Sequence, residues 1–205
     1  MSYCGSIAAD ILAADCNDLP ISGVETTAWI MNLADIDKTT STVDSNGMIT
    51  NLAITTVGKA ANTISALEKA LRGETTLTQG TYKPTWDHKV GIKIFDNCPL
   101  IKKSINDLSL GRYVVVIANK WRKTTVTSPE VVGQTVYECY GWGQGLTLVE
   151  ATRATDDNEL SAGWNVTLGC AEGEMENFPP RIVFKTSEAL TLAMLVALET
   201  PVPVP

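Results

Sequence analysis

Short runs of β-branched and aromatic residues, separated by turn residues, recur along most of the 205-residue chain. Branched side chains fit the pleated surface of a sheet, and short runs of them between turn signals are typical of strands. The pattern predicts eight strands, over residues 26–35, 47–56, 86–95, 112–121, 135–142, 146–154, 163–170 and 181–185. The fourth contains the run YVVVIA, which is apolar on both faces and therefore predicts a central position in the fold.

Other segments carry apolar residues at helical spacing. Residues 57–72 place such residues on one helical face before the stop signal Gly73 (Ala60, Ile64, Leu67 and Leu71). Residues 99–108 do the same after a capping residue, Asn97, and an initial proline, Pro99 (Ile101, Ile105 and Leu108). The apolar segment 188–198 fits a helix or a strand, and we favour a helix.

Antiparallel strands therefore dominate the expected fold. The predicted class is α+β, mainly β: an antiparallel β-sandwich or curled sheet with one or two flanking helices. The length suits one domain. We divide the chain into an N-terminal arm (residues 1–25), a single β-rich domain (26–186) and a C-terminal arm (187–205), whose Pro-rich end, PVPVP, cannot join a central strand.

Histidine and cysteine are too sparse for most catalytic or metal sites. The chain has one histidine, His88, and five cysteines, no two of which are closer than twelve positions. A zinc knuckle needs close pairs of thiolates, so we expect no metal and no cofactor. A nucleophilic pair of Cys98 and His88 is one enzymatic alternative. We favour unreactive thiols in a reducing cytoplasm, a histidine at the surface or a strand edge, and no enzymatic activity.

Three further features each allow a structural and a functional interpretation. Residues 141–145 (GWGQG) precede a strand and not a helix, which predicts a hairpin turn in preference to a dinucleotide-binding loop. The acidic residues between positions 156 and 176 favour a solvated rim over a cation site or a glycosidase pair. The five tryptophans favour core or interface positions over a sugar-binding platform, for which Trp142 and Trp164 are the candidates.

Charge is distributed unevenly. The whole chain has a net charge of −7, and this negative charge argues against general attraction to nucleic acid or anionic membranes. Residues 83–123 nevertheless carry a net charge of +6. This basic block predicts either a nucleic-acid surface or one half of a head-to-tail contact with the acidic C-terminal third. Few aromatic residues interleave with the cations, so we favour the self-contact. The candidate subunit-interface residues are Lys102, Lys103, Arg122, Lys123, Asp156, Asp157, Glu172 and Glu174.

Several stretches also resemble known proteins. They are GRYVVVIANKW, the segment from TVYECYGWGQG to LGCAEGE, PPRIVF and, before them, GKAANTISALEKALRG. Over roughly residues 50–185 the chain resembles virion proteins of crAss-like bacteriophages. The resemblance implies a tail-tube-like ring or collar protein, with a β-sandwich or curled sheet and a flanking helix repeated around an axis through which DNA passes. It carries over no functional residue, because the role belongs to surfaces.

The expected function is therefore structural. We expect a closed homo-oligomeric ring or tube segment of a phage tail or neck, assembled in the host bacterial cytoplasm and contacting neighbouring tail, portal or ring proteins. Genomic DNA would pass through the lumen without specific binding, the basic block would not line the lumen continuously, and no membrane is involved. The alternative is a binding module, either a head-decoration or a carbohydrate-binding β-sandwich.

Overall fold

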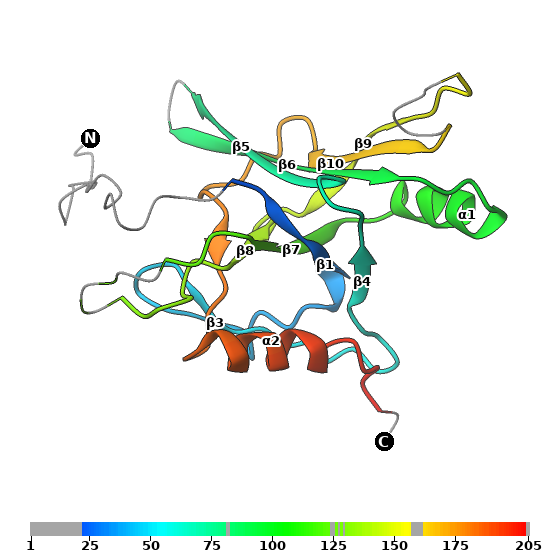
Figure 1. The fold of residues 1–205 in the computed structure, drawn as a ribbon. Coiled ribbons are helices and arrows are strands. Elements are labelled where there is room, and N and C mark those ends of the chain that lie inside the picture. Colours follow the sequence, from blue (N-terminus) through cyan, green and yellow to red (C-terminus); the bar gives the residue numbers. More distant parts are fainter. Residues whose placement is uncertain are drawn as a thin grey trace.

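The computed structural model describes residues 22–80, 83–123, 126, 128, 130–156 and 162–203. These residues form a large antiparallel sheet with two helices, which confirms the predicted α+β, mainly β class. Figure 1 shows three layers stacked on one another. Two layers belong to one curled sheet, and the third consists of a short hairpin and a helix.

The curled sheet contains nine strands. The upper layer in Figure 1 runs in the order β9 (Leu146–Thr152), β10 (Trp164–Cys170), β6 (Pro84–Ile94) and β5 (Leu71–Gln79). The middle layer runs in the order β4 (Asn62–Ser65), β1 (Val24–Asn32), β7 (Tyr113–Asn119), β8 (Tyr137–Tyr140) and β11 (Arg181–Ile182). The lower layer holds β2 (Thr42–Val43), β3 (Ile49–Asn51) and α2 (Glu188–Ala197), while α1 (Pro99–Leu108) closes one end.

The curl arises where β8 continues into β9. Both strands run antiparallel to β7, since Tyr140 lies opposite Val115 and Leu146 lies opposite Tyr113. Residues 141–145 form a loop between them, after which β9 leaves β7 and pairs with β10. The expected hairpin turn at this loop is therefore wrong. The two strands run in the same direction, as one strand that a loop interrupts.

Strand β7 is buried on both faces, as its apolar sequence predicted. Its residues from Tyr113 to Ala118 are each at most 9% exposed. Successive side chains of a strand point to opposite faces, so β7 contributes to two cores. Val114 and Val116 belong to the core shared with the lower layer, and Val115 and Ile117 to the core shared with the upper layer.

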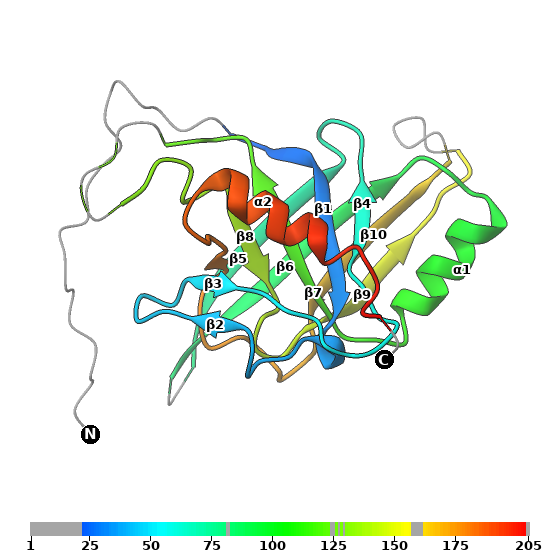
Figure 2. The same ribbon diagram turned by 90° about the horizontal axis from the view of Figure 1, so that it is seen from below.

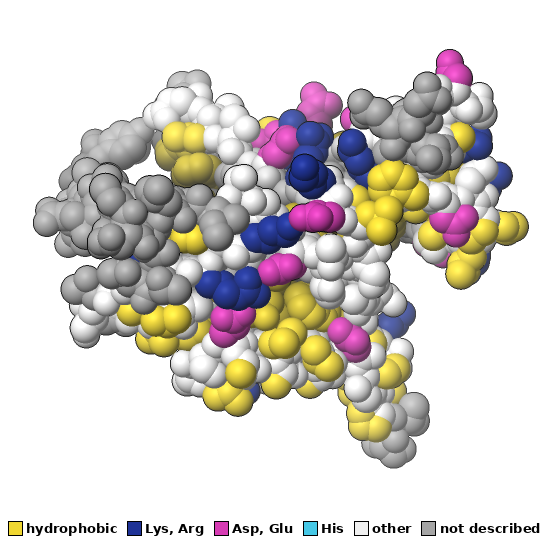
Figure 3. Space-filling model, viewed as in Figure 1, with side chains coloured by type: hydrophobic (Ala, Val, Ile, Leu, Met, Phe, Trp, Pro, Cys, Tyr) yellow, Lys and Arg dark blue, Asp and Glu magenta, His cyan; other side chains and the backbone are white. Residues whose placement is uncertain are grey.

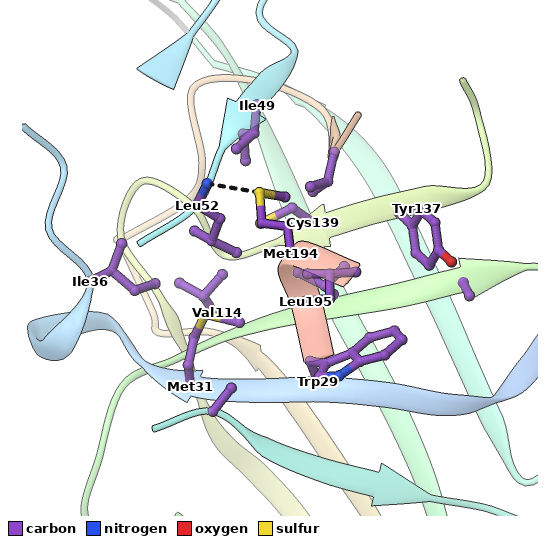
Figure 4. Close-up of a cluster of buried hydrophobic side chains, with 14 of the residues drawn as sticks. Trp29, Met31, Ile36, Ile49, Leu52, Val114, Tyr137, Cys139, Met194 and Leu195 are labelled. Atoms are coloured by element: carbon purple, nitrogen blue, oxygen red, sulfur yellow. Dashed lines mark hydrogen bonds between the residues drawn. The ribbon is translucent and has the colours of Figure 1, made fainter. Parts of the chain in front are cut away.

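The lower core joins segments that are far apart in sequence (Figure 4). Trp29 of β1 packs in the same cluster as Leu195 of α2, which is fully buried. The Leu52 N–H donates a hydrogen bond to the sulfur of Met194 at 3.3 Å. Just beyond α2, Glu199 accepts a hydrogen bond from the Trp29 indole at 2.8 Å. Figure 2 shows α2 lying across the middle layer.

The upper core lies between the two layers of the curled sheet. Val90, Val166 and Leu168 are fully buried there, and α1 contributes Ile105. The helix expected over residues 99–108 is thus confirmed, together with its apolar face. Its N-cap residue is Cys98 and not the expected Asn97, and no side chain accepts a hydrogen bond from the N–H groups of its first turn. The Asp96 carboxylate instead accepts hydrogen bonds from the Asn97 and Cys98 N–H groups just before the helix.

The helix favoured over residues 188–198 is also confirmed, as α2. No helix in the described part of the chain is long and apolar enough to cross a membrane.

The helix expected over residues 57–72 is wrong. This segment forms β4, a turn in which Lys69 has a φ of 64°, and the start of β5. Ile64 of β4 lies opposite Ala28 of β1, and the Ala61 N–H binds the Leu198 carbonyl at 2.8 Å. Pairing with distant strands outweighs the local helical periodicity, because asparagine, threonine and isoleucine have only weak helix propensity. Gly73, expected to stop a helix, lies inside β5.

The other predicted strands are present with shifted ends. The segment 47–56 contributes only β3, whose hairpin with β2 turns at Gly47, where φ is 83°. Residues 181–185 contribute only the two residues of β11. Strand β5 has no counterpart among the eight predicted strands.

The two predicted arms are described to different extents. Residues 1–21 of the expected N-terminal arm lie outside the described residues, and its last residues begin β1. The expected C-terminal arm, residues 187–205, begins with α2 and packs on its own chain over its described part. Val202 accepts a hydrogen bond from the Gly58 N–H at 2.9 Å and donates one to the Lys59 carbonyl at 3.1 Å.

Candidate functional site

The predicted interface residues fall on several separate parts of the molecule. Lys102 and Lys103 are exposed on α1, where Lys103 pairs with Asp107 at 3.6 Å. Asp156 is exposed just after β9, and Glu172 is exposed in the turn after β10. Asp157 lies outside the described residues. Within the described part of the chain, no ion pair joins a basic candidate to an acidic one.

Arg122 and Lys123 already have acidic partners in the same chain. Arg122 donates to Glu188 of α2 at 2.8 Å and to Glu25 of β1 at 3.0 Å. These hydrogen bonds raise the pKa of the Arg122 guanidinium. Lys123 pairs with Glu130 at 2.6 Å. The contacts of Arg122 therefore tie the segment after β7 to both β1 and α2.

Most of the basic block is engaged in the same way. Seven of its nine cations contact an acidic or amide side chain of this chain (Lys83, Lys89, Lys103, Arg112, Lys120, Arg122 and Lys123). The predicted candidate Glu174 is the partner of Arg112. Figure 3 shows basic and acidic side chains interleaved across one face. The fold therefore brings together charges that the sequence separates.

The tryptophans form no exposed platform. All five lie among the described residues, and each is buried or half-buried. Trp142 packs against the lower core and Trp164 against the upper core. The stacking surface that a sugar-binding module requires is therefore missing at both candidate positions.

A buried polar site surrounds the loop 141–145. Glu176, only 4% exposed, accepts hydrogen bonds from the Gly143 N–H at 2.9 and 3.0 Å and from the Gln144 N–H at 2.7 Å. A side chain at position 143 would collide with this carboxylate, so the site requires glycine there. Consecutive N–H groups that converge in this way form an anion-binding nest, which the chain fills with its own carboxylate.

His88 of β6 holds the same loop and is only 2% exposed, so its expected place at the surface or a strand edge is wrong. Its Nδ1 accepts a hydrogen bond from the Gly141 N–H at 3.2 Å. Its Nε2 lies near the Phe178 backbone without hydrogen-bond geometry. Burial lowers the pKa of His88, while Glu176, the Phe178 backbone and Asp87 act in the opposite direction.

Cations cover the outer side of the loop. Lys38 donates to the carbonyls of Trp142 at 2.8 Å and Gly143 at 3.2 Å, and lies 5.5 Å from the centre of the Trp142 ring system. Arg112 donates to the Gln144 carbonyl at 3.2 Å. The N–H groups of the loop thus have side-chain acceptors on the inner side, and its carbonyls have cationic donors on the outer side.

This arrangement holds a loop, and neither of its titratable side chains is exposed. His88 and Glu176 are buried, and the hydrogen bonds of both side chains go to backbone N–H groups of the loop. Cys98, which the disfavoured enzymatic alternative paired with His88, lies at the start of α1. Within the described ranges, no three His, Cys, Asp or Glu side chains gather as a metal site would require.

An apolar groove of about 820 Å³ lies between β4 and α1. Its walls come from β1, β4, β6 and α1 (Ile30, Ile64, Ile92, Ile94, Ile101 and Leu108). Leu67 and Phe95 are exposed beside it. Among the described strands β4 pairs with β1 alone, so one edge of β4 has no strand partner. Figure 3 shows hydrophobic side chains beside α1 on this face.

The opposite end of the sheet carries a projecting hairpin, made of the end of β5 and the start of β6 (Figure 1). Residues Thr76 to Gln79 are exposed on both faces, and Leu77 is 49% exposed. They pair with β6 as far as Pro84. Strand β10 pairs with β6 only from Ile94 to Lys89. In the described part of the chain, no third strand extends this end of the hairpin.

Comparison with known proteins identifies no relative. No protein-family model, no curated protein and no solved structure matches this chain.

Proposed function

We propose that this protein is a structural component of a bacteriophage virion, whose copies form a ring or tube segment of the tail or neck. The observation that carries the proposal is the projecting β5–β6 hairpin, exposed on both faces. A two-stranded hairpin is only marginally stable in water, and an unpaired strand edge is a template for another chain. A second copy that covers this end would bury Leu77 and satisfy the free edge of β5.

The groove is the complementary surface in this proposal. The hairpin and the groove lie at opposite ends of the molecule (Figure 1), so a contact between them is head-to-tail and repeats from copy to copy. The groove offers apolar walls and the free edge of β4, which suit a hairpin that binds by strand addition. Repeated contacts of this kind close into a ring or stack into a tube.

The charge arrangement supports passage of DNA through such a ring. Phosphate binding requires free cations, and seven of the nine cations of the basic block are engaged within the chain. Neighbouring tail, portal or ring proteins would contact the rims of the ring, in a virion assembled in the host cytoplasm. Lys102, Asp156 and Glu172 are exposed and have no described ion pair, so they remain candidates for these contacts.

Native mass spectrometry and light scattering of the full chain test the proposal. We expect one closed oligomer that persists at high salt, because the proposed contact rests on strand pairing and on burial of Leu77 against the apolar walls of the groove, and not on exposed ion pairs. Leu77→Asp should shift the protein toward monomer. Val149→Asp is the matched control, because Val149 is equally exposed, at 49%, on β9. A strict monomer at high protein concentration and low salt would contradict the ring.

The monomeric outcome would favour the alternative, a head-decoration or carbohydrate-binding module. The groove is the feature that favours this second function, since its volume lies in the range of small-molecule sites. The covered tryptophans argue against a sugar platform. Screening glycans against the monomer would decide between the two kinds of module, with binding expected only if the groove accepts a sugar.

A further inference from the structure

The loop 141–145 is held on its inner side by two titratable side chains, and each must be in its deprotonated form. Glu176 accepts hydrogen bonds from Gly143 and Gln144 with both carboxylate oxygens, which leaves no room for a proton facing the amides. His88 accepts from the Gly141 N–H through Nδ1, so that nitrogen carries no hydrogen. The hydrogen bonds of these three loop N–H groups therefore depend on the protonation states of His88 and Glu176.

Protonation of His88 or Glu176 weakens the hydrogen bonds that hold the loop 141–145 in place. A proton on Nδ1 of His88 would point at the Gly141 N–H and replace an acceptor by a donor. A proton on Glu176 removes the charge that makes its hydrogen bonds to the nest strong. Neither side chain has solvent beside it to take over these hydrogen bonds, because both are almost fully buried.

Several charged or titratable groups face this pair. On the strands these are Asp87 beside His88 on β6, Tyr140 and Cys139 on β8, and Cys170 on β10, whose sulfur accepts the His88 backbone N–H at 3.4 Å. Tyr140 donates to Glu138 at 2.9 Å. Lys38 and Arg112 approach from the outer side of the loop, where they donate hydrogen bonds to its carbonyls. None of the strand groups supplies a second acceptor to the loop amides among the described contacts.

We propose that the His88–Glu176 pair is an acid-released latch, which holds the loop 141–145 at neutral pH and frees it on acidification. The loop is the junction at which the chain passes from the middle to the upper layer. Release therefore loosens Trp142 and the joint between the two layers, while β7 and both cores stay in place. This inference does not depend on the assembly proposed above, because every group in it belongs to one chain.

The sign of the pH dependence follows from the folded environment. Burial lowers the pKa of His88, so the unfolded or released state binds the proton more readily than the latched state. The latch is then fully stable above the ordinary histidine pKa of about 6.5 and weakens as the pH falls below it. Each unit of acidification in that range favours the released loop by up to about tenfold.

Amide hydrogen exchange at residue resolution, corrected for the intrinsic pH dependence of exchange, tests the latch. In the wild-type chain we expect the protection of Gly143 and Gln144 to fall by about tenfold or more between pH 7.5 and 5.0. The protection of β7 amides should stay unchanged over the same range. Glu176→Gln mimics the protonated acid and should leave the loop weakly protected at both pH values.

Two further variants separate the latch from a general loss of structure. His88→Asn keeps an acceptor near the position of Nδ1 but does not titrate, so the release should move to lower pH. Glu172→Gln neutralises an exposed acid of the same connection and should exchange like the wild type. Constant protection of Gly143 and Gln144 down to pH 4.5 in the wild type would overturn the inference, even if Glu176→Gln fails to fold.

Discussion

At the residue scale, Leu195 shows how one side chain can hold distant segments together. It lies on α2, near the end of the described chain, and is fully buried in a core that includes Trp29 and Met31 of β1. The same cluster contains Ile49 of the lower hairpin and Val136 before β8. Close-packed interiors have few voids, so the neighbours of Leu195 cannot relax far to fill a gap.

Truncation of this side chain should therefore be costly. We expect Leu195→Ala to lower the free energy of unfolding by about 3 kcal/mol, through lost burial and the remaining cavity. Urea denaturation at fixed protein concentration measures this difference. Leu192→Ala, on the same helix but 42% exposed, should change the stability by less than about 1 kcal/mol. Equal losses in the two variants would contradict the placement of α2.

The candidate polar site was beyond the reach of sequence reasoning at this scale. His88 stands in a strand of alternating character, and Glu176 stands among acidic residues that predicted a solvated rim. Their shared target is a set of backbone N–H groups, which every residue except proline carries. A constellation built on the backbone leaves no spacing of side chains to recognise. Only the glycines of the loop were a signal, and they suggested a turn.

At the element scale, a helix or strand was predicted correctly where the residues of that segment themselves show which of its faces are buried. Strand β7 was predicted correctly because a strand covered on both faces has a continuous apolar sequence. Helix α1 was predicted because its buried stripe and its initial proline are local signals. The prediction for the segment 57–72 was wrong because β4 forms by pairing with the edge of β1, a distant strand. No pattern within the segment itself indicates that this edge is available. Strand β5 was also missed, because it is mostly polar and exposed and therefore lacks the apolar pattern of a buried strand.

Because α2 packs into the lower core, its removal should disrupt that core. A chain that ends at residue 186 lacks the helix that covers Trp29, and we expect it to bind a hydrophobic dye strongly and to unfold without a cooperative transition. Near-ultraviolet circular dichroism during heating measures the transition. A chain that ends at residue 203 is the matched control and should melt like the full protein, because Val202 keeps its hydrogen bonds to Gly58 and Lys59. A cooperative transition in the shorter chain would show that α2 is dispensable.

At the scale of the whole molecule, the uneven charge of the sequence becomes a network within one chain. Acidic residues from both outer thirds pair with the basic block. Glu68 pairs with Lys120, and Glu25 and Glu188 pair with Arg122. Pairs of this kind at the surface contribute little energy individually. Their larger effect is to balance most of the positive charge of the basic block, since six of its nine cations have an acidic partner in the same chain.

This network predicts that the protein does not retain DNA. In an electrophoretic mobility assay with duplex DNA at physiological salt, we expect no shift at protein concentrations up to about 10 µM. The net charge of −7 acts in the same direction. Changing Glu68 and Glu188 to lysine removes the partner of Lys120 and one of the two partners of Arg122, and adds two cations, so this variant is the positive control. Retention of DNA by the wild-type protein would contradict the expected passage without specific binding.

The position of α2 also has a consequence for the order in which the protein is made. Translation produces β1 early and α2 last among the described elements, yet Met194 and Leu195 of α2 belong to the core beneath β1. Domains often fold as they emerge from the ribosome, starting with their N-terminal part. Here the core on the side of β1 that carries Trp29 is complete only after residue 195 has emerged. During synthesis, the apolar residues on this side of β1 therefore wait longer for their last core partners than those of any later described strand.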